Sequence, residues 1–254
     1  MSRVASRSPT RYVAPESLAY SASLWPYEPG ARLTFDESYR LGHLPLVAPD
    51  HPAVIRSVQH RDYASGRYDA RRISLILPVD ADALAASATF QDIQRDLAAR
   101  SLGGKVAWEL SRRRASRLHA TLVPGIAEED LAGVAARVAE VMETYGPLRY
   151  RLGGPFVGTR NRGRIYFTVF PEWIGDGDVF SLLQEALGVP RTRFYVVGYY
   201  NLTDELTGEE SADLAAFLAT WADATVAELT APSLTLLATH DDLARESEVL
   251  ASIG

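Results

Sequence analysis

The stretch Arg117-Leu118-His119-Ala120-Thr121-Leu122-Val123 decides how this chain is interpreted. Its alternation of polar and apolar residues predicts a β-strand, because successive side chains of a strand point to opposite faces. Arg117, His119 and Thr121 therefore share one face, while the leucines and the alanine take the other. A cation, a titratable imidazole and a hydroxyl in a row suit the handling of a phosphate group.

A second stretch of the same kind, Arg193-Phe194-Tyr195-Val196-Val197-Gly198-Tyr199, occurs further along the chain. Aligned on its arginine, it places Tyr195 at the position of His119 and Val197 at the position of Thr121. Each of the two stretches stands between expected helices, and such an internal duplication is a stronger architectural signal than any single element. We therefore expect His119 and Tyr195 to face each other across a shared cleft.

The hydrophobic pattern elsewhere predicts alternating strands and helices. The expected strands are 72–78, a broken region within 106–123, 148–157, 164–170, 193–200 and 233–239, and the expected helices are 80–100, 128–145, 178–187 and 207–226. This order predicts an α+β fold in which duplicated β-α-β halves form two small antiparallel sheets arranged in a V. The helices would lie outside, and the central cleft would lie between the sheets.

Composition restricts the class of protein. The chain has 254 residues, no cysteine and a formal net charge of -6. The absence of cysteine excludes disulfides and thiolate chemistry, and the negative charge argues against bulk nucleic-acid binding but not against a local basic pocket. No apolar run reaches the length of a membrane span, and the first residues lack the apolar region of a secretory signal. We expect a cytoplasmic protein that makes no membrane contact.

Residues 1–70 are expected to form an irregular, Pro- and Tyr-rich extension that packs on a domain formed by residues 71–254. Its role as a lid, an oligomer contact or a separate small unit stays open, as does the oligomeric state. His43, His51 and His60 lie here in a spacing that fits no zinc template, so they are interpreted as ordinary loop histidines. We predict no metal site.

The element order and the His-x-Thr strand resemble the two-histidine phosphoesterase superfamily. That superfamily includes bacterial RNA 2′,5′-ligase-like proteins and cyclic nucleotide phosphodiesterases. The resemblance extends over residues 72–245, and its motifs are Leu118-His119-Ala120-Thr121-Leu122, the strand Ile73-Ser74-Leu75-Ile76-Leu77-Pro78 and the closing Leu234-Thr235-Leu236-Leu237. Residues 1–70 lie outside it.

The resemblance implies metal-independent hydrolysis without a cofactor, in which two histidines act as general base and general acid and two hydroxyls bind the phosphoryl oxygens. Only His119 and Thr121 carry over, because the aligned second motif reads Tyr195-x-Val197. A tyrosine with a pKa of ~10 stays protonated at neutral pH, whereas a histidine with a pKa of ~6.5 exchanges protons. The chain is therefore interpreted as a divergent member in which Tyr195 is the partner of His119.

The residues expected to bind substrate are arginines and tyrosines near these two strands: Arg117, Arg193, Arg164, Tyr166 and Tyr199. The expected ligand is a phosphorylated or nucleotide-like small molecule, or an RNA end, because the rigid guanidinium fork suits phosphate oxygens. The triple arginine Arg112-Arg113-Arg114 is expected at a solvated hairpin turn, with contact to an anionic substrate as the alternative.

Three functions remain open at this point. The first is a phosphoesterase-like enzyme that hydrolyses a cyclic phosphodiester or performs a cyclisation, elimination or isomerisation in biosynthesis. The second is a catalytically degenerate module that binds a nucleotide or an RNA end. The third sets the resemblance aside: His119 is then a strand histidine bonded to a carbonyl, Tyr195 is a core aromatic residue, and the arginines are solvated. Fold similarity alone does not decide among them.

Overall fold

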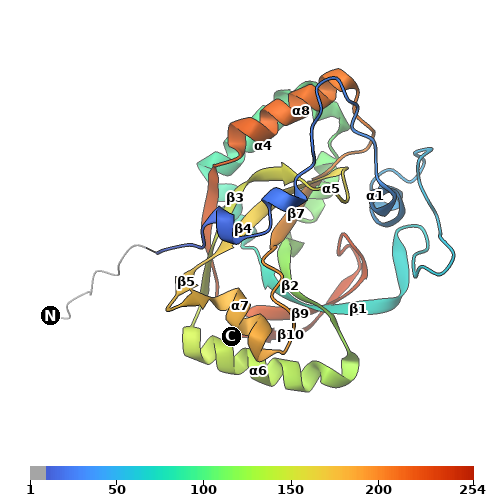
Figure 1. Ribbon diagram of the computed structural model, residues 1–254. Coiled ribbons are helices and arrows are strands. Elements are labelled where there is room, and N and C mark those ends of the chain that lie inside the picture. Colours follow the sequence, from blue (N-terminus) through green and yellow to red (C-terminus); the bar gives the residue numbers. More distant parts are fainter. Residues whose placement is uncertain (1–9) are drawn as a thin grey trace.

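The computed structural model describes residues 10–254 and shows an α+β architecture built on one large antiparallel sheet (Figure 1). Its eight strands follow the spatial order β10-β9-β1-β2-β7-β4-β3-β8, and a separate hairpin pairs β5 with β6. The strands are β1 (Arg67–Pro78), β2 (His119–Ile126), β3 (Leu148–Val157), β4 (Arg164–Pro171), β5 (Trp173–Ile174), β6 (Gly177–Asp178), β7 (Val196–Asn201), β8 (Thr225–Ala231), β9 (Leu234–Asp241) and β10 (Ser247–Ile253). The predicted α+β class is confirmed.

The large sheet consists of two four-stranded halves that meet at a narrow seam. We call β10-β9-β1-β2 the first half-sheet and β7-β4-β3-β8 the second half-sheet. Ladders inside each half extend over several residue pairs, whereas β2 and β7 share one register pair, Ala120 with Val197. The two small sheets expected from the sequence thus correspond to the two half-sheets, which are joined through the single register pair between β2 and β7.

Helices cover one face of this sheet. α4 and α8 contact the second half-sheet at β8 and β3, and α6 and α7 contact the first half-sheet at β10 and β2 (Figure 1). The helices are α1 (Glu37–Gly42), α2 (Leu44–Val47), α3 (Ala81–Ala86), α4 (Ala88–Ala99), α5 (Trp108–Arg113), α6 (Leu131–Tyr145), α7 (Val179–Ala186) and α8 (Gly208–Trp221). We call the opposite, more polar side of the sheet the groove face.

The N-terminal segment, residues 10–66, crosses the groove face of the second half-sheet. Figure 1 shows it passing in front of β4 and β7 before it reaches α1. The Tyr20 hydroxyl donates to the carbonyl of Tyr195 at 2.7 Å, and the Tyr39 hydroxyl donates to the carbonyl of Leu202 at 2.7 Å. The segment also contributes Val13, Leu33 and Phe35 to the buried core.

The region of the triple arginine is helical, which corrects the expectation of a strand and hairpin turn within 106–123. Residues 108–113 form α5, and β2 begins only at His119. Glu109 accepts hydrogen bonds from Arg112 at 2.8 Å and Arg113 at 2.9 Å. This i, i+3 and i, i+4 spacing of opposite charges stabilises a helical turn, and it was a sequence signal for the helix.

Two strands of the large sheet, and the short hairpin of β5 and β6, were not anticipated from the pattern. β8 begins at the end of the helix expected over 207–226 and continues beyond it, and β10 follows the last expected strand. The helix that precedes β8 begins with a capping box between Thr207 and Glu210 and ends at Trp221. Among the described residues, no helix is both long and apolar enough to span a bilayer.

Candidate functional site

His119 and Thr121 lie on the groove face of β2, as the alternation of the strand predicts. Ala120, between them, is fully buried on the helix-covered face. His119 is partly buried and Thr121 is exposed. The Nδ1 atom of His119 lies 2.8 Å from the carbonyl oxygen of Arg117. Because a carbonyl only accepts hydrogen bonds, Nδ1 carries the proton and Nε2 carries a free lone pair in the neutral ring.

Tyr195 lies on the opposite face of the sheet, so the structure does not bring it to His119 as expected. Its side chain is 0% exposed, and its ring packs on Phe180 of α7 at 5.0 Å between centroids. Its hydroxyl donates to Oε1 of Gln184, also on α7, at 3.1 Å. Burial raises the pKa of Tyr195 to about 12. The residue is a structural bridge between β7 and α7.

The register of the seam explains this difference. Ala120 pairs with Val197, and directly paired residues of antiparallel strands project to the same face. The residues of β7 that share the groove face with His119 and Thr121 are therefore Val196 and Gly198. Alignment on the arginines was wrong by one residue, and a slip of one residue moves every side chain to the other face. The second strand thus offers no acid–base group to the groove.

Two arginines converge on the groove side of Gly198. Arg114 donates to the Gly198 carbonyl at 3.5 Å and to the Leu243 carbonyl at 2.6 Å. Arg164, from β4, donates to the same Gly198 carbonyl at 3.2 Å. A Cβ atom on Gly198 would overlap the Arg164 guanidinium, so the absent side chain leaves room for this arginine. Neither arginine has a carboxylate within ion-pairing distance among residues 10–254.

A second histidine, His43 at the junction of α1 and α2, also reaches this place. The Arg164 NH1 group lies 2.9 Å from its Nε2 atom. Guanidinium groups only donate, so Nε2 accepts and the proton of His43 is on Nδ1, which has no partner. The ring stacks on Tyr39 with centroids 5.4 Å apart and planes 7° apart. We call His43, Arg114, His119 and Arg164 the central cluster.

Burial and charge keep both histidines of the central cluster neutral. Desolvation, together with the positive charges of Arg114 and Arg164, lowers the pKa of His119 to about 4. The hydrogen bond that His119 donates to the carbonyl of Arg117 acts in the opposite direction. The same desolvation and the same two arginines hold the pKa of His43 well below its usual value. Desolvation and Arg164 lower the pKa of Arg114 to about 9, which leaves it cationic at neutral pH. The groove therefore combines positive charge with neutral imidazoles.

An open pocket of about 730 Å³ borders the central cluster at Arg114. We call it the arginine pocket, and its walls include Arg114, Arg117 and Arg245 together with Leu46 and Trp108. Arg117 hydrogen-bonds to backbone carbonyls of Ala244 and Arg245, and Arg245 to the carbonyl of Leu46. The guanidinium groups of Arg114, Arg117 and Arg245 therefore bond to neutral backbone groups. Arg112 and Arg113, which also line the pocket, are instead paired with Glu109 in the same wall.

The other predicted binding residues divide between environments. Tyr166 lies on the groove face, stacked on Phe156 at 5.6 Å, with the Arg164 guanidinium 5.3 Å from its ring centroid. Tyr199 is buried among core aromatics, 5.2 Å from Phe90 of α4. The expectation that Tyr199 lines the cleft is wrong, because a bulge in β7 at this residue turns it toward the helices.

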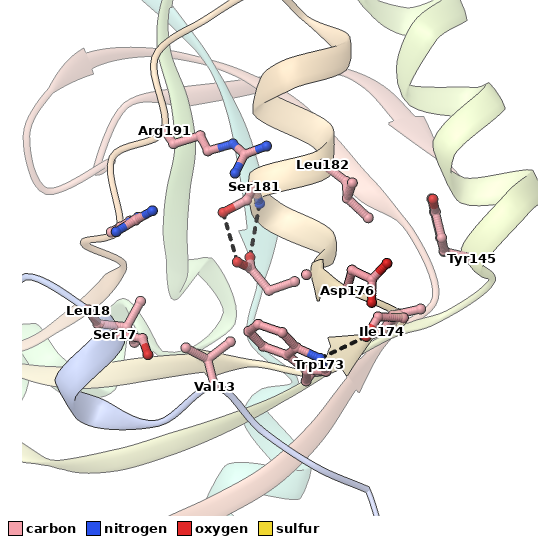
Figure 2. A pocket seen from close by; sticks show the side chains of 14 residues that line it. Val13, Ser17, Leu18, Tyr145, Trp173, Ile174, Asp176, Ser181, Leu182 and Arg191 are labelled. Atoms are coloured by element: carbon pink, nitrogen blue, oxygen red, sulfur yellow. Dashed lines mark hydrogen bonds between the residues drawn. The ribbon is translucent and has the colours of Figure 1, made fainter.

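Arg193 also lies away from His119. It precedes β7 with a φ of 50°, and it lines a different pocket with Arg191 and Asp178. Figure 2 shows that pocket at the start of α7, where the Asp178 carboxylate accepts hydrogen bonds from the backbone and hydroxyl of Ser181. The two arginines that guided the alignment therefore serve separate sites.

Two members of the central cluster, Arg114 and His43, were not among the residues predicted for the site. Arg114 had a signal, because it ends a triple arginine placed only a few residues before His119. His43 had none, because the approach of α1 to β4 is a tertiary contact. Within residues 10–254, no group of three His, Asp or Glu side chains gathers in a way that would hold a metal ion.

Comparisons with known proteins give little further guidance. No protein-family profile matches the chain, and no curated protein matches its sequence. Among solved structures, the chain is similar to TT0787 of Thermus thermophilus, with 14% sequence identity and a TM-score of 0.42, over 72% of this chain and 96% of that chain. A similarity at this level identifies neither a family nor a site.

Proposed function

We propose that the protein binds a phosphorylated, nucleotide-like small molecule where the arginine pocket meets the groove face of β2. The observation that carries this proposal is the set of guanidinium groups without carboxylate partners: Arg114, Arg117 and Arg245 line one pocket, and Arg164 lies in the adjoining central cluster. Arginine forks match phosphate oxygens in charge and geometry. The formal charge of the whole chain is -6, so the cationic character is local.

Binding is favoured over two-histidine hydrolysis because the groove has one imidazole–hydroxyl pair. β7 supplies Val196 and Gly198 where a second pair would stand. The second imidazole of the central cluster, His43, is buried and its Nε2 is occupied by Arg164. Removal of one proton-transfer partner costs ~10²–10⁴-fold in rate, which leaves recognition as the main activity.

A second candidate function is slow phosphoester cleavage with His119 as the only base. The free Nε2 lone pair of a neutral ring favours it. In that reaction Nε2 would take the proton of an attacking hydroxyl or water, and the arginines would neutralise the phosphoryl oxygens. The P–O bond to the leaving oxygen would break, and that oxygen would take a proton from water or from the protonated His119.

Titration calorimetry with AMP and with adenosine tests the proposal, because the two ligands differ only in the phosphate. We expect AMP to bind and adenosine to bind at least ~10-fold more weakly, since a charge-assisted hydrogen bond contributes ~1.5–3 kcal/mol. Arg117→Met should remove most of this difference. Arg95→Met is the matched control, because Arg95 is exposed on α4 and paired with Asp92 of the same helix.

Equal affinities for AMP and adenosine, or no binding of either, would contradict the proposal. Phosphorus NMR of the protein with 2′,3′-cyclic AMP then separates the two candidate functions. Binding without a new phosphomonoester signal supports the binding module. Turnover that His119→Gln abolishes, while AMP affinity is retained, supports the single-base reaction.

A further inference from the structure

A second pocket, of about 920 Å³, lies over the groove face of the second half-sheet, away from the arginine pocket. We call it the aromatic pocket. Its floor is formed by β3 and β4, one wall by the N-terminal segment and the other by the end of α8 and the turn that follows. Its aromatic lining consists of Tyr20, Trp25, Tyr27, Phe156 and Phe170. Its volume lies in the range of ~300–1,000 Å³ that is typical of small-molecule sites.

A bulge in β3 shapes the floor of this pocket. The pairing of β3 with both neighbours shifts register after Leu152, at the pair Gly153-Gly154. A Cβ atom on Gly154 would overlap the backbone carbonyl of Trp221 at the end of α8, and one on Gly153 would overlap Phe170. Glycine is therefore required at both positions for this close approach. Bulges are over-represented beside functional sites, where they re-aim side chains.

Arg151 is the cationic group of the aromatic pocket. It makes no hydrogen bond or ion pair with any residue in 10–254, and its Nε atom is buried without a partner. Its guanidinium instead lies 4.6 Å from the ring centroid of Phe170 and 5.7 Å from that of Tyr12. Glu228 on β8 is the cross-strand partner of Arg151, but its carboxylate interacts with Tyr12. Burial and, after it, this carboxylate raise the pKa of Tyr12 to about 12.

We propose that the aromatic pocket binds a flat aromatic compound that carries a single carboxylate, with the carboxylate paired to Arg151. The aromatic lining offers faces for stacking, and the guanidinium offers unused donors for two carboxylate oxygens. Glu16 and Asp223 also line the pocket, so a ligand with several negative charges would be repelled. This separates the aromatic pocket from the arginine pocket, which collects positive charge.

The matched probes are 2-naphthoate and its neutral analogue 2-naphthamide, titrated separately into the full-length protein with calorimetry as the readout. We expect naphthoate to bind ~10-fold or more tightly than naphthamide, the ratio that a charge-assisted hydrogen bond provides. Arg151→Met should erase that preference and leave naphthamide binding unchanged. Arg95→Met should retain it, because that arginine lies on the exposed side of α4.

A second variant guards against an effect of Arg151→Met on folding. Ala219 is exposed on α8 and lines the pocket, so Ala219→Trp should block both probes without disturbing the core. Equal binding of the two probes, an unchanged preference in Arg151→Met, or no saturable binding would overturn the proposal. Displacement of naphthoate by AMP would also overturn it, because the two pockets would then not be separate sites.

Discussion

The strands β2 and β7 are the edge strands of the two half-sheets and meet at the seam, yet they present different side chains to the groove face. β2 directs His119 and Thr121 into it, whereas β7 directs Val196 and Gly198 there and turns Tyr195 toward α7. Cross-strand pairing determines which residues of the two strands share a face. Similar residues at the start of two strands do not determine this.

The groove face of β7 carries no polar side chain at Val196 and Gly198, and other residues of the second half-sheet make contacts there. Arg164 lies in the space above Gly198 and reaches His43 of the N-terminal segment. The same segment anchors Tyr20 on the backbone of β4 and β7. His119 on the first half-sheet is thus partly exposed, whereas the second half-sheet is largely covered by the N-terminal segment.

The largest expected effect concerns Tyr195, the residue that the sequence placed in the site. Tyr195→Ala removes a fully buried aromatic ring, so it should lower the free energy of unfolding by ~3–5 kcal/mol. Thr121→Val, at the exposed position on β2, should change it by less than ~0.5 kcal/mol. Urea unfolding at neutral pH measures both. If Tyr195→Ala changed the free energy of unfolding as little as Thr121→Val, Tyr195 would not be a core residue.

Gly198→Ala tests whether the glycine makes room for Arg164. The added methyl group would displace the guanidinium, so we expect a loss of ~1–3 kcal/mol in the free energy of unfolding and weaker AMP binding. Ala120→Gly on the paired strand is the comparison, because it removes a methyl group from the opposite face and should leave AMP affinity unchanged. Retained stability and AMP affinity in Gly198→Ala would contradict the role assigned to Arg164.

A third expected effect is a pH dependence of the free energy of unfolding that arises from His119 on β2. The pKa of His119 falls from 6.5 to about 4 on folding, so the unfolded chain binds a proton that the folded chain excludes. The free energy of unfolding should therefore decrease as pH falls from 6.5 toward 4. His119→Gln should show a shallower decrease, and the remaining slope should include His43, whose pKa shifts in the same direction.

Urea midpoints measured in steps between pH 7 and pH 4 provide that comparison. His240→Gln is a suitable control, because His240 lies at the end of β9, outside the central cluster. If the urea midpoints of the unmodified protein and of His119→Gln changed with pH in parallel, folding would not shift the pKa of His119.

Many helices and strands could be predicted from the sequence because caps and polar–apolar periodicity involve residues that are close together in the chain. The capping box at Thr207 and Glu210 places the start of α8, and polar–apolar alternation places His119 and Thr121 on one face of a strand. The helix at 108–113 was missed because an apolar run outweighed the spacing of Glu109 and its arginines. β8 was missed because Val226 fits a helical stripe as well as a strand.

The sequence by itself determined the α+β class and the shared face of His119 and Thr121, since both follow from the two-residue period of a strand and the 3.6-residue period of a helix. Only the tertiary structure decided which residues of β7 face them and that His43 and Arg114 join them. Register and docking depend on contacts between residues distant in sequence, and a shift of one residue reverses every side chain of a strand. No local pattern of residues contains that information.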